Sequence, residues 1–285
     1  MPKSSSIYQL VTEACEQAAM KNSQRIFVEA VKRYCARHDI AVEVRSQGWL
    51  IVMQPGSKRH FALGYDVGLN SAIAHRIAND KAATSEVLGL AGIACVPHTV
   101  FLGPKLGEHI APSGSWVAML ALLEQHPEGI VVKPNEGTSG RSVFRVSSRP
   151  GLERAAQEIF SSNLTLAISP YVEIEDEVRV ILVDELPVVV YSKDRSHLNW
   201  RHNLDAGARP VLLDQGEAHE ACVALAVRAA KAIGIRFASF DVLRVGGAYQ
   251  ILEINSGVMM EALGKLHPEL VEAAYSAALD KVFGL

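Results

Sequence analysis

The pattern of apolar and polar positions predicts short strands and amphipathic helices along the whole chain. Residues 5–20 and 23–38 match helices, and in the second the apolar positions Val28, Val31 and Tyr34 roughly keep the helical period. Three short β-type runs follow, AVEVRS, WLIVMQ and HFALGY, which are separated by Gly, Pro and Ser. We expect these elements to form a small N-terminal α/β unit over residues 1–78.

The remainder of the chain is richer in strand-like runs than in helices. Helical patterns begin near Asn79 or Asp80 and recur in SWVAMLALLEQHP, LERAAQEIFSS, EAHEACVALAVRAAKAIG and LVEAAYSAALDKVF. The runs LTLAISPYVE, EVRVILVD and LPVVVYSK follow one another without an intervening helix, and FASFDVLRV pairs with AYQILEIN around a Gly-Gly turn. This order favours an antiparallel α+β body over a doubly wound parallel sheet.

Composition narrows the class of protein. Hydrophobic residues make up 49% and charged residues 21%, and the net charge of −3 argues against a basic surface for nucleic acid. None of the four cysteines pairs at C-x-x-C spacing, so neither a zinc knuckle nor a disulfide framework is indicated. No signal-peptide core and no run of about 18 apolar residues occurs. We therefore expect a soluble cytoplasmic protein without a nucleic-acid or membrane partner.

Two apolar, strand-like segments near the C-terminus each keep a carboxylate. Glu253 and Asn255 are two positions apart and so point to one face of their strand, and Asp241 falls opposite Glu253 when the hairpin is counted back through its turn. A lone carboxylate is costly to bury, and a small cluster of hard oxygen donors suits magnesium. The alternative from spacing alone is a set of solvated residues on an exposed face.

A run of small residues, Gly137, Thr138, Ser139 and Gly140, lies between two strand-like segments. Their backbone amides and hydroxyls could approach a phosphate, although the run is neither a Walker A loop nor G-x-G-x-x-G. A hairpin tip explains the same residues equally well.

Cationic residues occur in unusual places. Lys133 stands inside the apolar run IVVKP and must snorkel or find an anion, and Lys81 opens a helix, where its charge opposes the macrodipole. Lys193 and Arg201 belong to or flank the long polar segment 194–210, which is a candidate functional loop. Cations close to a polyphosphate neutralise charge that shifts during phosphoryl transfer. Taken by itself, Lys81 is better explained as an ordinary exposed surface lysine.

The order of these segments carries a family resemblance. From NDK through VVKPNEGTSGRSV, SPYVEIEDEVRV, WRHNLDAGA and FDVL to ILEIN, the chain resembles the ATP-grasp superfamily of carboxylate–amine ligases over about residues 65–260. It is most similar to the ATP-grasp domain of cyanophycin synthetases and bifunctional glutathione synthetases, and it shares R-x-N-L-x-x-G and E-x-N with ribosomal-protein glutamate ligases. The resemblance implies two α/β lobes that clasp ATP within residues 79–285, a small one at about 95–170 and a large one at about 171–285.

The resemblance also implies roles for individual residues. The nucleotide would be held by Lys81, Lys133, Gly137, Thr138, Ser139, Gly140, Tyr171, Val172 and Glu177. The transferred phosphoryl group would be stabilised by Arg179, Lys193, Arg201 and Asn203. Magnesium or manganese would be held by Asp241, Glu253 and Asn255.

The expected function is ATP-dependent amide formation through an acylphosphate, with release of ADP and phosphate, on amino acids or a small peptide. Three alternatives remain open: a non-catalytic ATP-binding scaffold or sensor, a ligase that modifies a peptide or protein, and phosphotransfer to a hydroxyl. No serine–histidine–acid triad can be nominated among the ten histidines. Dimers are common in the superfamily, so a homodimer is an option by analogy.

Overall fold

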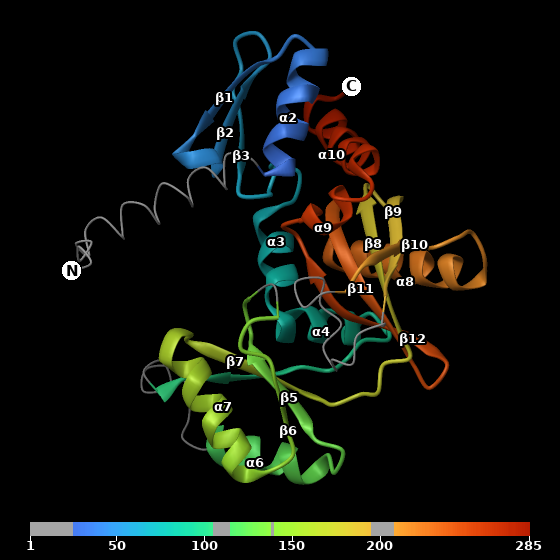
Figure 1. The fold of residues 1–285 in the computed structure, drawn as a ribbon. Coiled ribbons are helices and arrows are strands. Elements are labelled where there is room, and N and C mark those ends of the chain that lie inside the picture. Colours follow the sequence, from blue (N-terminus) through green and yellow to red (C-terminus); the bar gives the residue numbers. More distant parts are fainter. Residues whose placement is uncertain (1–24, 105–114, 138–139, 195–207) are drawn as a thin grey trace, which may run out of the picture. The chain divides into compact units, whose positions relative to one another are not determined.

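The computed structural model describes residues 25–104, 115–137, 140–194 and 208–285. These form two compact units, which are coloured along the chain in Figure 1. Unit 1 contains the residues up to Asn70 together with Gly257–Leu285, and unit 2 is Ser71–Ser256. The helix expected at residues 5–20 lies outside the described residues, and the predicted lobe boundaries stay a prediction.

Unit 1 combines an antiparallel sheet with helices from both ends of the chain. Strands β1 (Ala41–Arg45), β2 (Leu50–Gln54) and β3 (His60–Leu63) pair in chain order, with the short 3-10 helix η1 (Ser46–Gly48) between the first two. Helix α2 (Ile26–Arg37) packs on β1 and on the closing helix α10 (Pro268–Phe283), which follows the short α9 (Glu261–Gly264). The amphipathic pattern of α2 explains this, because its buried side is the apolar one.

The interior of unit 1 joins the two chain segments through aromatic residues. Phe27 of α2 packs edge-on against Tyr275 of α10, and both are fully buried. Tyr34 donates a hydrogen bond of 2.8 Å from its hydroxyl to Asp280. The C-terminal helix is therefore part of the same core as the N-terminal strands.

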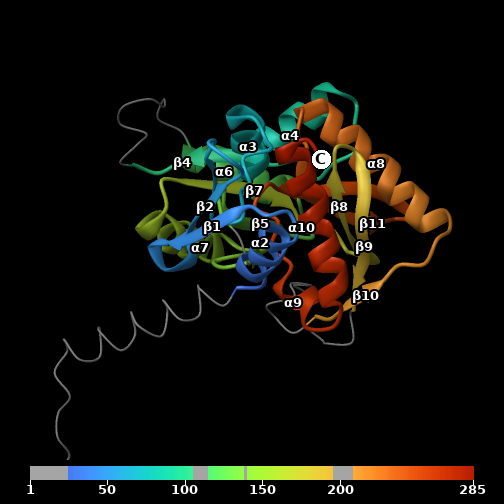
Figure 2. The same cartoon turned by 90° about the horizontal axis from the view of Figure 1, so that it is seen from above.

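Unit 2 contains two antiparallel sheets. The larger has the strand order β10-β9-β8-β11-β12, and its strands are β8 (Asp176–Val183), β9 (Leu186–Lys193), β10 (Pro210–Leu212), β11 (Phe237–Val245) and β12 (Ala248–Asn255). Helices α3 (Ala72–Asn79), α4 (Lys81–Leu90) and α8 (Glu217–Ile233) cover one face of it, as Figures 1 and 2 show.

The two faces of this large sheet differ in chemistry because side chains alternate along each strand. One face carries Val178, Val180, Phe240, Val242 and Ile254, which pack with α8 in the main core. The other face carries Glu177, Arg179, Lys193, Asp241 and Glu253. The polar face is thus the one opposite to α8 and the main apolar core.

The β11–β12 hairpin sets the register of that polar face. It turns through Gly246 and Gly247, both with positive φ, as a two-residue hairpin turn requires. A continuous ladder from this turn would place Leu252 opposite Asp241. A bulge shifts the register between Asp241 and Val242, so that Glu253 pairs with Asp241 instead.

The smaller sheet of unit 2 has the order β4-β7-β5-β6. Its strands are β4 (Thr99–Leu102), β5 (Ile130–Pro134), β6 (Phe144–Val146) and β7 (Thr165–Pro170), and helices α6 (Ser115–Gln125) and α7 (Arg149–Ser162) contribute to its core. The α+β expectation is confirmed. Across the described ranges, no helix has the length and apolar character needed to cross a membrane.

Candidate nucleotide and metal site

A row of polar side chains crosses four strands of the large sheet. In register, Glu253 of β12 pairs with Asp241 of β11, Asp241 with Arg179 of β8, and Arg179 with Tyr191 of β9. Neighbouring residues in such a row lie on the same face of the sheet. The polar row Glu253–Asp241–Arg179–Tyr191 therefore spans the face of the sheet that is turned away from α8.

Asp241 is the electrostatic centre of the polar row. Arg179 donates from Nε to Oδ1 and from Nη2 to Oδ2, both at 2.7 Å, and the Nζ of Lys193 lies 3.2 Å from Oδ1. Lys193 also donates to Glu177, its neighbour on β8. Lys193, Glu177 and Asp241 are all at least nine-tenths buried. Buried charges need such pairing, because an isolated ion is strongly destabilised away from water.

The pKa values reflect this pairing. Burial alone would raise the pKa of Asp241, but Arg179 and Lys193 outweigh it and hold that pKa well below the usual range. Burial likewise opposes the charge of Lys193, yet Asp241 and Glu177 raise its pKa. Both shifts favour the charged forms of Asp241 and Lys193, whereas burial raises the pKa of Glu177.

Glu253 and Asn255 present oxygens that no described residue occupies, since neither side chain makes a hydrogen bond or ion pair there. Asp241 can join them as a metal ligand. A carboxylate has about four acceptor positions, and Arg179 and Lys193 use three of those of Asp241, which leaves about one for a metal ion. Within the described ranges, no group of three His, Cys, Asp or Glu side chains has metal-binding geometry. The predicted set of two carboxylates and one amide still fits a hard cation that keeps waters and phosphate oxygens.

Lys133 is a buried cation without a protein partner among the described residues. It lies on β5, is only 6% exposed, and makes no hydrogen bond or ion pair there. Burial lowers the pKa of Lys133 to about 8, with Glu253 the largest opposing influence. An unpaired buried lysine near a carboxylate is the arrangement expected where an anionic ligand binds.

Lys81 is the first residue of α4 and is buried against the small-residue run. Its Nζ donates to the carbonyl oxygens of Gly137 at 3.0 Å and Asn135 at 3.4 Å. The N-terminus of α4 is already capped, because Asp80 accepts from the backbone of Ala83. Lys81 thus has one further N–H for a ligand. The capped N-terminus of α4 has fewer backbone N–H groups left to bind one.

The predicted adenine contacts lie just after β7. The backbone N–H of Tyr171 donates to the carbonyl of Gly129 at 3.0 Å, so that this group is used within the protein. The guanidinium of Arg145 stacks on the Tyr171 ring at 3.5 Å. Val172 follows Tyr171 and is half-buried, and its contact with adenine stays a prediction.

Four of the predicted residues fall outside the described part of the chain. Gly137 and Gly140 flank the small-residue run, and Gly140 has a positive φ of 64°. Thr138, Ser139, Arg201 and Asn203 lie outside the described residues. Their predicted roles stay predictions.

Two buried polar groups were not nominated from the sequence. Among the described residues, no hydrogen-bond partner is found for either ring nitrogen of His98. The hydroxyl of Tyr191 likewise has none. Burial and the charges of Lys133 and Lys81 hold the pKa of His98 well below its usual range. Tyr191 could have been found from the alternation in VVVYSK, which puts it on the same strand face as Lys193.

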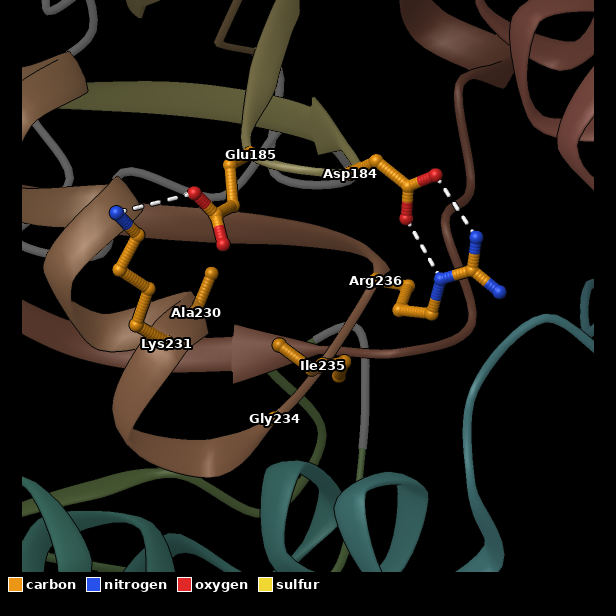
Figure 3. A pocket seen from close by; sticks show the side chains of 7 residues that line it. All are labelled: Asp184, Glu185, Ala230, Lys231, Gly234, Ile235 and Arg236. Carbon is orange, nitrogen blue, oxygen red and sulfur yellow. Dashed lines mark hydrogen bonds and ion pairs between the residues drawn. The ribbon is translucent and has the colours of Figure 1, made fainter.

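A surface hollow of about 450 Å³ lies at the other end of β8 from Glu177 (Figure 3). Its charged side chains neutralise one another: Asp184 pairs with Arg236 at 2.6 and 2.8 Å, and Glu185 pairs with Lys231 at 3.1 Å. These groups are already satisfied and substantially exposed. The hollow is therefore separate from the polar row and is a weak candidate for the chemistry.

Two antiparallel sheets with helices on one face of the larger sheet and a polar row on the other define an α+β architecture, and comparisons with known proteins identify its family. The family of RimK-like ATP-grasp domains matches residues 113–269. The chain belongs to this family, which confirms the ATP-grasp resemblance and the predicted fold.

Similar proteins carry ligase names. A probable alpha-L-glutamate ligase of Pasteurella multocida is 25% identical over 73% of this chain and 62% of its own length. One of Stenotrophomonas maltophilia is 29% identical over 65% of this chain and 60% of its own length. The chain thus spans about three fifths of these relatives.

Solved structures share the fold. A D-alanine–D-alanine ligase from Bacillus anthracis complexed with ATP has a TM-score of 0.58 at 18% identity, covering 75% of this chain and 68% of that one. A bifunctional glutathione synthetase from Pasteurella multocida has a TM-score of 0.57 at 14% identity, covering 91% of this chain and 44% of that one.

Proposed function

We propose that this chain binds Mg·ATP on the polar face of the large sheet and joins a carboxylate to an amine. The observation that carries the proposal is that, within the described residues, buried Lys133 has no hydrogen-bond or ion-pair partner and is influenced electrostatically by Glu253, whose side chain, like that of Asn255, is also unpaired there. A cation and a set of oxygen donors left without protein partners are what a metal–polyphosphate complex would satisfy.

The nucleotide would be held from both sheets. Lys133 and the free N–H of Lys81 would bind the α- and β-phosphates, and residues 137–140 would close over the γ-phosphate. Val172 would contact the adenine through its backbone, and Glu177 would hold the ribose hydroxyls. Asp241, Glu253 and Asn255 would hold Mg²⁺ or Mn²⁺, which when bound neutralises phosphate charge.

The side chains of the polar row would then stabilise phosphoryl transfer. A substrate carboxylate oxygen attacks the γ-phosphorus, the bond to the β-phosphate oxygen breaks, and ADP leaves. Arg179 and Lys193, with Arg201 and Asn203, would neutralise the charge on the transferred group. The amine nitrogen then attacks the acyl carbon, phosphate leaves, and the amine gives up a proton. We assign no side chain as general base.

The substrates would be amino acids or a small peptide. The names of the relatives, which are probable alpha-L-glutamate ligases, make L-glutamate the first reactant to try. Attachment to a peptide or protein is the second reading, and it shares the same nucleotide site.

The test uses the purified chain with Mg·ATP and a panel of L-amino acids that includes glutamate. Hydroxylamine replaces the unknown amine, because it converts an acylphosphate to a hydroxamate that can be measured by colour with iron(III). ADP and hydroxamate formed in equal amounts would support the proposal. Mg·ATP binding without any product would instead identify a non-catalytic nucleotide-binding module.

A further inference from the structure

The hydroxyl of Tyr191 is a buried hydrogen-bonding group that the protein does not use. Tyr191 is 0% exposed, and its Oη has no partner among the described residues. A buried hydroxyl without a hydrogen bond is destabilising relative to a paired one. Tyrosine hydroxyls in protein interiors therefore usually have a partner, and a missing one points to a ligand.

The position of Tyr191 in the polar row indicates which part of a ligand it would meet. It stands at the opposite end of the row from Glu253, three strands away, which corresponds to roughly 14 Å at the usual strand spacing. Arg179 lies between them, with Nε and Nη2 given to Asp241. The remaining N–H groups of Arg179 and the Tyr191 hydroxyl are thus uncommitted donors at the end of the row remote from Glu253.

We propose that the Tyr191 hydroxyl donates a hydrogen bond to the carboxylate that is being activated, and holds it for attack on the phosphoryl group. This inference rests on the proposed function, in which the metal-bound triphosphate occupies the Glu253 end of the row. The attacking carboxylate must then approach the γ-phosphate from the far side, where Arg179 and Tyr191 stand. A phenol is suited to this task because it donates to an anion without adding another charge.

The test removes only the hydroxyl, in Tyr191→Phe. Since that oxygen has no protein partner, the midpoint of thermal unfolding should stay unchanged or rise. The Kd for Mg·ATP measured by calorimetry should also stay unchanged. In the hydroxamate assay, kcat/KM for the carboxylate should fall about ten- to a hundredfold, as for loss of a hydrogen bond to a charged group.

Tyr249→Phe provides the matched control. Tyr249 is on β12 of the same sheet and packs with the main core. Its replacement therefore removes a tyrosine hydroxyl outside the polar row. It should leave kcat/KM within about twofold of the unsubstituted chain.

The outcomes separate the two proposals. A wild-type chain that forms no hydroxamate with any carboxylate overturns the proposed function and this inference with it. A wild-type chain that is active, with Tyr191→Phe equal to it in kcat and KM, overturns only the role of Tyr191. A fall in thermal stability together with weaker Mg·ATP binding would show that the hydroxyl serves the fold, and would also overturn it.

Discussion

Arg179 clasps Asp241 through two hydrogen bonds of 2.7 Å, and it does so where the carboxylate is almost wholly buried. Lys193 reaches the same carboxylate from β9. The three side chains come from adjacent strands of one sheet, so their spacing is fixed by backbone pairing. This rigidity suits a site that must neutralise moving negative charge without rearranging.

Asp241→Asn should damage both stability and function. The substitution removes the negative charge that compensates Arg179 and Lys193 but keeps the shape of the side chain. Breaking a buried ion pair by removing one partner costs about 3–5 kcal/mol, so the free energy of unfolding in urea should fall by that order. ADP formation should be lost, because the cations and the metal would both lose their shared anchor.

Asp184→Asn is the matched comparison for that variant. Asp184 also makes a two-bond pair with an arginine, Arg236, but this pair is exposed in the hollow of Figure 3. Exposed pairs contribute about 0–1 kcal/mol, so Asp184→Asn should change unfolding by less than about 1 kcal/mol and leave turnover intact. Equal losses in the two variants would contradict the importance we assign to the buried pair.

Binding of Mg·ATP should weaken as pH rises through the pKa of Lys133. That pKa is about 8 in the free protein because burial disfavours the charged form. Phosphate binds the ammonium form, so the Kd should be flat between about pH 7 and 7.5. Above pH 8 it should rise by up to about tenfold per pH unit, which calorimetry at a series of pH values would measure.

The same shift affects stability with a defined sign. The pKa of Lys133 is lower in the folded chain than its ordinary value of 10.5, so the unfolded chain binds more protons between about pH 8 and 10.5. The contribution of Lys133 to stability is therefore present above pH 10.5 and is lost as pH falls through 8. Lys133→Met should raise the free energy of unfolding at pH 7 while it weakens Mg·ATP binding. Lower stability in this variant would mean that Lys133 has a protein partner.

Gly129 should be intolerant of a side chain. It has a φ of +100°, and an added Cβ would lie 2.8 Å from the carbonyl oxygen of Val146. Its own carbonyl accepts from Tyr171 at the predicted adenine contact. Gly129→Ala should therefore cost well over about 1 kcal/mol in thermal or urea unfolding and raise the KM for ATP.

Gly234→Ala separates backbone strain from steric clash. Gly234 also has a positive φ, +72°, but an added Cβ would meet no atom within 4 Å. This variant should lose only about 1 kcal/mol, the usual cost of a left-handed residue. If both variants lost the same amount, the close approach to Val146 would not be the cause.

The sequence predicted the polar face well because alternation in strands is a local property. The positions of Asp241 and Glu253 followed from counting along a hairpin, and the structure pairs them. The two-residue turn alone would put the pair one position out of register, and a bulge, which strand alternation does not predict, restores the pairing.

Other features of the site were beyond the sequence because they depend on contacts between distant segments. Arg179 was assigned to the phosphoryl group, but no local pattern showed that it clasps Asp241. The orphan hydroxyl of Tyr191 and the unpartnered ring of His98 become visible only when burial and all neighbours are known. The return of Gly257–Leu285 to the N-terminal unit is likewise a tertiary result.

Calorimetric titration of the wild-type chain and of Glu253→Gln with Mg·ATP shows whether the polar row binds the nucleotide. Glu253 is the one carboxylate of the described polar row without an ion pair, so its substitution should spare the fold. We expect saturable one-to-one binding by the wild type and at least about tenfold weaker binding by the variant, with an unchanged unfolding midpoint. Failure of the wild type to bind Mg·ATP, or equal affinity in the two chains, would contradict it.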